Sequence, residues 1–209
     1  MNSVETEVKF HVPDSPAMRA ELLSLGARSL GRSHERNIRF ENEAKGLRGA
    51  DSLLRLRRDR KCTLTYKCAP AQTDPEFKQL TELEVEVSEF DTMRLILASL
   101  GFHSEQVYEK WRETFVLDHT AFCLDDLPFG SFLEIEGPKE QIRGFAGRLA
   151  LQWGRRILLN YLEIFEIIRA DQDLSFSDVT FANFAGLTPD ITSFLPRIEA
   201  GRPAHPPSV

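Results

Sequence analysis

The chain has 209 residues, of which 42% are hydrophobic, and its 26 Lys and Arg against 32 Asp and Glu give a formal net charge of −6. This composition is typical of a globular protein with its own core, and the acidic balance argues against nucleic acid as a partner. We expect no membrane association and a reducing, cytoplasmic setting, because the chain lacks a signal peptide, an apolar stretch of roughly 18 residues and any CxxC pair.

Alternation of apolar and charged residues over 4–12 predicts a first strand, since side chains switch faces at every residue. Breakers bound further strands predicted at 28–41, 51–60, 62–68, 80–89, 107–118, 119–126 and 131–137. Helical spacing predicts helices at 15–25, 91–100, 139–151 and 155–169, with Asp91 capping the second. The short connections favour antiparallel pairing. The fold class is therefore α+β, with eight strands.

We expect one main domain over residues 1–170 and an extension over 171–196 that packs on it. The extension contains Phe176, Phe181, Phe184 and Phe194. These rings can wrap the main domain, close an opening in it, or pack in a homodimer, and the sequence does not choose among the three. The Pro-rich residues 197–209 are predicted to be disordered.

The acidic average hides one basic stretch. Residues 28–67 contain twelve Lys and Arg but only five acids, Glu35, Glu41, Glu43, Asp51 and Asp59. This part of the protein is basic enough to meet an anion.

Five strands carry an ionic side chain at every second residue. These are Glu5, Glu7 and Lys9; Arg55 and Arg57; Glu82, Glu84 and Glu86; Lys110 and Arg112; and Glu134 and Glu136. A solvated sheet face explains each pattern taken alone. Eight strands can close into a barrel that admits one small ligand, and five ionic faces pointing inward would be costly without one. Arginines suit phosphate oxygens and clustered carboxylates suit a hard divalent cation, so the set indicates a metal-bound polyphosphate.

At this point the motifs resemble a known family. Glu5 to Lys9 is an ExExK sequence, and the remaining motifs follow in the family's order. They are Leu54-Arg55-Leu56-Arg57, Leu64-Thr65-Tyr66-Lys67, the acidic strand with Glu82, Glu84 and Glu86, Lys110-Trp111-Arg112, Leu124-Asp125-Asp126, Gly130 to Glu136, and Asn160-Tyr161-Leu162-Glu163. The ordered set over about residues 3–165 is similar to the CYTH superfamily, also called triphosphate tunnel metalloenzymes.

The resemblance implies an eight-stranded antiparallel β-barrel, a tunnel with helices packed outside, and Mg²⁺- or Mn²⁺-dependent chemistry on triphosphates. Carried over by position, the implied metal ligands are Glu5, Glu7, Glu134 and Glu136, with Asp125 or Glu84 added. The implied phosphate-binding residues are Lys9, Arg39, Arg55, Arg57, Lys67, Lys110 and Arg112, of which Lys9, Arg57 and Lys67 are expected to be catalytic.

The resemblance leaves the reaction open. We favour hydrolysis of a small triphosphate: inorganic triphosphate, thiamine triphosphate or a nucleoside triphosphate. The first alternative is a class IV adenylyl cyclase, which makes cyclic AMP and pyrophosphate from ATP. The His-Phe pair that precedes ExExK in the bacterial cyclases is absent here. The second alternative is a non-catalytic module that binds polyphosphate or nucleotide.

Overall fold

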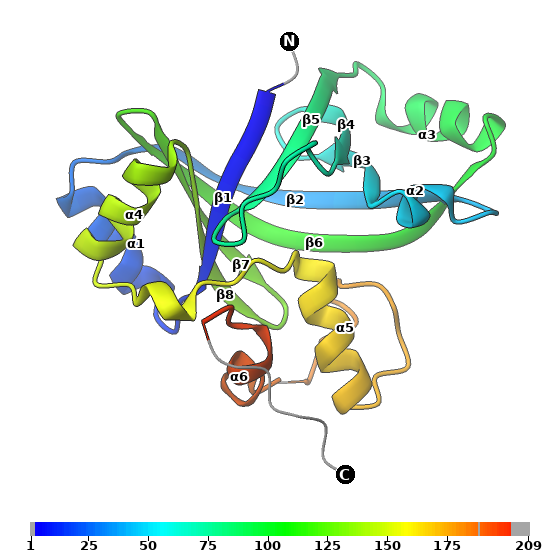
Figure 1. Ribbon diagram of the computed structural model, residues 1–209. Helices are drawn as coiled ribbons and strands as arrows, with labels where there is room; N and C mark the ends of the chain where they lie inside the picture. Colours follow the sequence, from blue (N-terminus) through cyan, green and yellow to red (C-terminus); the bar gives the residue numbers. More distant parts are fainter. Residues whose placement is uncertain (1–2, 188, 202–209) are drawn as a thin grey trace.

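The computed structural model describes residues 3–187 and 189–201, and its eight strands form one closed antiparallel ring, a β-barrel (Figure 1). The strands are β1 (Ser3–His11), β2 (Arg28–Asn42), β3 (Ser52–Arg58), β4 (Cys62–Cys68), β5 (Lys78–Glu86), β6 (Phe102–Leu117), β7 (Thr120–Leu127) and β8 (Gly130–Glu136). Their order around the ring is β1-β5-β4-β3-β2-β6-β7-β8. The predicted fold class is confirmed.

Strand β1 closes the ring, because it pairs with β5 along one edge and with β8 along the other. Glu7 lies opposite Lys78 on β5 and opposite Glu136 on β8. Side chains two residues apart share a face, so this register turns the ionic face of β1 into the ring and leaves Val8 and Phe10 outside it.

The helices are α1 (Ser15–Ser24), α2 (Gly46–Gly49), α3 (Phe90–Ser99), α4 (Lys139–Arg148), α5 (Tyr161–Asp171) and α6 (Leu195–Ile198). Of these, α1, α3 and α4 cover apolar outer faces of the strands. Leu22 of α1 and Ile142 of α4 are buried in one cluster with Val8 of β1. A second cluster joins Leu97 of α3 to Leu56 of β3. These two clusters therefore lie outside the ring.

Helix α5 and the C-terminal segment lie beneath one end of the ring (Figure 1). They bury Phe165, Phe184 and Phe194 in one cluster with Tyr108 of β6 and Phe132 of β8. Phe184 and Phe194 of the phenylalanine-rich segment therefore pack on the barrel at this end, against Tyr108, which also lines the interior.

Residues 177–181 run beside β6 at the part of that strand beyond the reach of β7. The Val179 amide donates to Val107 O (2.8 Å), and the Glu109 amide donates to Val179 O (2.9 Å). The Asp178 carboxylate accepts from the Val107 amide (2.8 Å). Since Val179 is fully buried, this segment completes a stretch of barrel wall.

The helix predicted at 155–169 begins later than expected, at Tyr161. Asn160 forms a capping box with Glu163 and thereby fixes the helix start. Upstream, Ile157 is extended and exchanges two backbone hydrogen bonds with Lys9, beyond the point where β5 leaves that edge of β1. The apolar residues before Tyr161 have helical spacing, but the backbone hydrogen bonds to the free edge of β1 at Lys9 favour the extended conformation.

Three further expectations differ in detail. Residues 197–201 are packed rather than disordered, since Ile198 is buried and the Ala200 amide donates to Arg156 O (2.8 Å). The remainder of the predicted tail, 202–209, lies outside the described residues. Helix α3 begins one residue before Asp91, which lies in its first turn rather than capping it. Strand β6 begins at Phe102 instead of residue 107. No helix in the described part of the chain is long and apolar enough to cross a membrane.

Candidate active site

The ring encloses a cavity of about 1090 Å³. Every strand except β7 contributes to its lining, and α5 contributes at one end. Twelve of the thirteen site residues singled out from the sequence line it: Glu5, Glu7, Lys9, Arg39, Arg55, Arg57, Lys67, Glu84, Lys110, Arg112, Glu134 and Glu136. The period of two along each strand brings them together.

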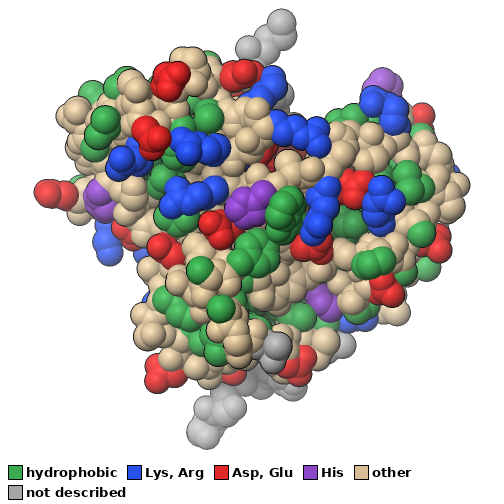
Figure 2. All heavy atoms as spheres, turned by 180° about the vertical axis from the view of Figure 1, so that it is seen from behind, with side chains coloured by type: hydrophobic (Ala, Val, Ile, Leu, Met, Phe, Trp, Pro, Cys, Tyr) green, Lys and Arg blue, Asp and Glu red, His purple; other side chains and the backbone are tan. Residues whose placement is uncertain are grey.

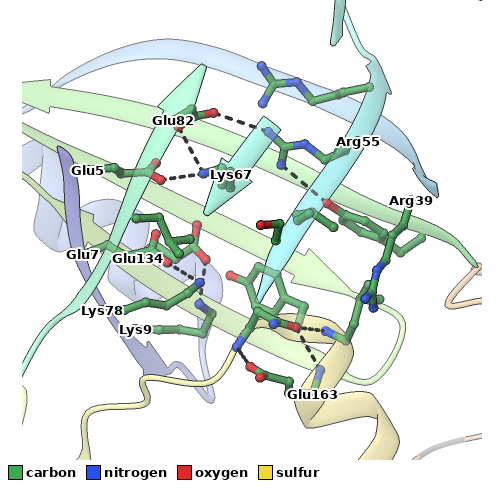
Figure 3. A pocket seen from close by; sticks show the side chains of 18 of the residues that line it. Glu5, Glu7, Lys9, Arg39, Arg55, Lys67, Lys78, Glu82, Glu134 and Glu163 are labelled. Carbon is green, nitrogen blue, oxygen red and sulfur yellow. Dashed lines mark hydrogen bonds and ion pairs between the residues drawn. The ribbon is translucent and has the colours of Figure 1, made fainter. Parts of the chain in front are cut away.

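Carboxylates from β1, β5 and β8 meet lysines on one side of the cavity (Figure 3). Lys67 Nζ lies 2.5 Å from Glu5 Oε2 and 3.1 Å from Glu82 Oε2. Lys9 Nζ lies 2.7 Å from Glu134 Oε1, and Lys78 Nζ lies 2.7 Å from Glu7 Oε1. Three of the four carboxylates on β1 and β8 are therefore held by ammonium groups.

Glu136 is the exception. Within the described residues, no basic side chain lies at ion-pair distance from it. Burial and the neighbouring charges of Glu5 and Glu7 raise the pKa of Glu136 to about 7. Burial, together with Glu7 and Glu82, also raises the pKa of Glu5 despite the opposing charge of Lys67. This side of the cavity thus has more negative charge than its lysines neutralise.

Arg55 and Arg57 of β3 supply cations on another side of the cavity. Their ion pairs to carboxylates are long, 3.6 to 4.0 Å. The Nε atoms of both arginines are buried without a hydrogen-bond partner. Buried polar groups in folded proteins nearly always find partners, so unsatisfied guanidinium donors beside a cavity indicate a place for an anionic ligand.

Glu35 of β2 lies behind these cations and is almost fully buried. Its carboxylate is 3.6 Å from Lys110 Nζ and 3.9 Å from both Arg57 and Arg112. Burial raises the pKa of Glu35, but Lys110, Arg112 and Arg57 outweigh that effect and lower it to about 2. Glu35 is thus a buried anion that holds three cations in the wall.

Asp125 differs from the other proposed metal ligands. It is fully buried and is not part of the cavity lining. Its carboxylate accepts hydrogen bonds from Lys110 Nζ (3.0 Å), Arg112 Nε (2.6 Å) and Tyr161 Oη (2.7 Å). With these donors on its oxygens, Asp125 holds Lys110 and Arg112 in the cavity wall, and its role as a metal ligand stays a prediction.

Sequence reasoning did not single out Lys78, Tyr108, Tyr161 or Glu35. The alternation on β5 runs back from Glu82 through Leu80 to Lys78, so extending the pattern by two residues further would have found that lysine. Tyr108 lies two residues before Lys110 on the same face of β6 and could have been found in the same way. Glu35 lies on the same face of β2 as Arg39, four residues earlier, so the period of two also turns it inward, although the sequence does not show that three cations surround it.

The basic stretch of residues 28–67 is divided between two faces. Arg39, Arg55, Arg57 and Lys67 line the cavity. Outside, exposed cations pair with acids, as Arg58 does with Asp91 and Lys61 with Glu86, and Figure 2 shows the two signs of charge interspersed over one outer face. With Arg48, five of the twelve Lys and Arg of the stretch line the cavity, so its positive charge is shared between the interior and the surface.

A divalent cation fits the acidic side of the cavity in its chemistry. Glu5, Glu7, Glu134 and Glu136 are hard oxygen donors on adjacent strands, and no basic side chain in the described part of the chain pairs with Glu136. The described residues nevertheless contain no ready-made group of three acidic, His or Cys side chains arranged around a metal position. Lysines hold most of these carboxylates, so a metal would have to exchange with an ammonium group.

A family model for the CYTH domain matches residues 3–175. The chain belongs to the CYTH family. The match ends just before the segment that lines β6, so residues 176–201 are an addition to the matched domain.

Named relatives of this CYTH protein agree with that placement. It is 29% identical over 135 residues to a Methanocaldococcus jannaschii protein named "Putative adenylate cyclase MJ0240", covering 64% of this chain and 76% of the other. The structure of protein PH1012 from Pyrococcus horikoshii has a TM-score of 0.66 at 28% identity, covering 76% and 98% of the two chains. An adenylyl cyclase homologue from Hippeastrum, described with a dominant triphosphatase activity, shares the fold at TM-score 0.57 and 17% identity, with 80% and 96% covered.

Proposed function

We propose that this CYTH protein hydrolyses a small triphosphate, with Mg²⁺ or Mn²⁺ as cofactor, inside the charged barrel. The observation that carries the proposal is that Arg55 and Arg57 line the cavity with only long ion pairs and, among the described residues, a buried Nε without a hydrogen-bond partner, while another side of the cavity has uncompensated carboxylates. An anion rich in oxygen, bound together with a cation, satisfies both sides at once.

The basic residues have distinct roles in this proposal. Arg55 and Arg57 bind phosphate oxygens directly, because their present ion pairs are long. Lys9 and Lys67, which pair with Glu134 and Glu5 on the acidic side, stabilise charge that develops on the transferred phosphoryl group. Lys110 and Arg112, which Asp125 and Glu35 hold in place, orient the rest of the phosphate chain.

A divalent cation would be held by Glu5, Glu7, Glu134 and Glu136, with Glu84 within the same cavity. When bound, it would neutralise phosphate oxygens and polarise the bond to the transferred phosphorus. The chain's own residues would fix the direction of the triphosphate and limit the access of water.

Adenylyl cyclase is the second candidate, and the name of the relative from Methanocaldococcus jannaschii favours it. Attack by a ribose hydroxyl on the α-phosphorus would use the same charged groups. The Hippeastrum protein is named a putative adenylyl cyclase but is described with a dominant triphosphatase activity. A cyclase name for a protein of this fold is therefore compatible with hydrolysis.

A product assay separates the candidates. Purified protein is incubated with inorganic triphosphate, thiamine triphosphate or ATP, with Mg²⁺ or Mn²⁺, and the products are separated by anion exchange. We expect release of orthophosphate, and the best substrate identifies the class. Cyclic AMP with pyrophosphate from ATP would make the protein a cyclase. Absence of turnover, with triphosphate still raising the melting temperature, would instead indicate a binding module.

A further inference from the structure

Lys78 of β5 lies on the acidic side of the cavity, beside the carboxylate of Glu7. It faces Glu7 directly across the β1–β5 pair, and its Nζ is 2.7 Å from Glu7 Oε1. Its side chain is about four-fifths buried. Both partners line the cavity, so Lys78 and Glu7 form an ion pair inside the ring.

The same carboxylates form the candidate metal site. Glu7 is engaged by Lys78 and Glu5 by Lys67, whereas Glu136, directly across from Glu7 on β8, has no such partner among the described residues. This arrangement explains why the cavity has the donors for a metal without a formed metal site. A lysine stem is long and flexible, so the ammonium can leave without a backbone change.

We propose that Lys78 is a placeholder for the divalent cation: it occupies the carboxylates of the empty site and is released toward the phosphates when metal binds. This inference rests on the proposed function. Metal binding at Glu7 frees a cation for the triphosphate, and triphosphate binding draws Lys78 away from Glu7. Because such coupling is reciprocal, each ligand strengthens the binding of the other.

Removing the placeholder tests the proposal. In Lys78→Met, Mn²⁺ alone no longer competes with an ammonium group, so its affinity, measured from the EPR signal of free Mn²⁺, should rise by about tenfold. Lys61→Met is the matched control, because Lys61 pairs with Glu86 at the same 2.7 Å on the exposed outside. Equal or weaker Mn²⁺ binding by Lys78→Met than by the wild type would overturn the proposal, and would make Lys78 a simple phosphate ligand.

The reciprocal variant decides the matter if Lys78→Met does not fold. Glu7→Gln should release Lys78 permanently, so binding of inorganic triphosphate in EDTA, measured by calorimetry, should strengthen by about tenfold while Mn²⁺ binding weakens. Unchanged or weaker metal-free triphosphate binding would contradict the placeholder role. If the wild type binds no triphosphate with or without Mn²⁺, the proposed function fails, and the Mn²⁺ comparison still decides the role of Lys78.

Discussion

The hydroxyl of Tyr161 donates a hydrogen bond to Asp125, with 2.7 Å between Oη and Oδ2, and so joins α5 to the basic wall of the cavity. Asp125 also accepts from Lys110 and Arg112. The ammonium groups of Lys9 and Lys110 lie 4.4 and 5.0 Å from the centre of the Tyr161 ring. A helix outside the ring thus helps to hold cations inside it.

Tyr161→Phe keeps the ring but removes the donor to Asp125. Since the bond is buried and its acceptor is charged, we expect a loss of about 1–3 kcal/mol in the free energy of unfolding, measured by urea denaturation. Tyr66→Phe is the control, because Tyr66 Oη lies 3.0 Å from the neutral Ser52 Oγ and Tyr66 does not line the cavity. Equal losses in the two variants would show that the Asp125 bond has no special weight.

Arg57→Ala should fold normally but lose activity. We expect kcat/KM for the best triphosphate to fall by about 100-fold or more, because a cation facing the phosphates is removed. Arg58→Ala is the control one residue away, since Arg58 points outward to Asp91 and Phe90. Similar activity in the two variants would place the substrate elsewhere.

The Glu35 carboxylate should make the protein sensitive to acid. Its pKa in the folded state is about 2, below the ordinary value of 4.5, so its stabilisation is complete above pH 4.5 and is lost as the pH falls toward 2. Relative to Glu35→Gln, we expect the stability advantage of the wild type to shrink by about 2 kcal/mol between pH 7 and pH 3. Urea unfolding of both proteins at the two pH values measures this change. A constant difference would contradict the assignment.

Asp178→Ala tests the segment beside β6. The substitution leaves the Val107 amide without its carboxylate acceptor, so we expect a loss of about 1–2 kcal/mol in the free energy of unfolding. Hydrogen exchange should accelerate at the Val107 and Glu109 amides while the β3–β4 pair stays protected. Asp171→Ala, which removes an exposed ion pair with Arg197, should change neither quantity appreciably. Unchanged exchange at β6 in Asp178→Ala would mean that this edge is held by other contacts.

Local periodicity made much of this fold predictable. Strand β4 has the predicted bounds. The ionic residues of β1, β3 and β8 face inward, because the apolar residues that alternate with them pack on the opposite, outer face. That the strands close into a ring was predicted from the resemblance to CYTH proteins, because the pattern of a single strand does not show which strands pair with it. The start of α5 was missed because the apolar spacing of residues 155–160 also suits an extended segment, and the free edge at Lys9 decides between the two. The position of Asp125 in its motif does not reveal that Tyr161, Lys110 and Arg112 donate to it.

Ring closure also constrains the order in which the protein can assemble. Strand β1 precedes the other strands in the chain, but its partners β5 and β8 follow much later. Glu7 of β1, for example, pairs with Glu136, the last residue of β8. Pairing between distant parts of a chain is slow, so sealing the β1–β8 seam should be a late step in folding. The acidic residues Glu5, Glu7, Glu134 and Glu136 lie on both sides of that seam, so a nascent chain does not have the complete acidic side of the cavity until its last strand is in place.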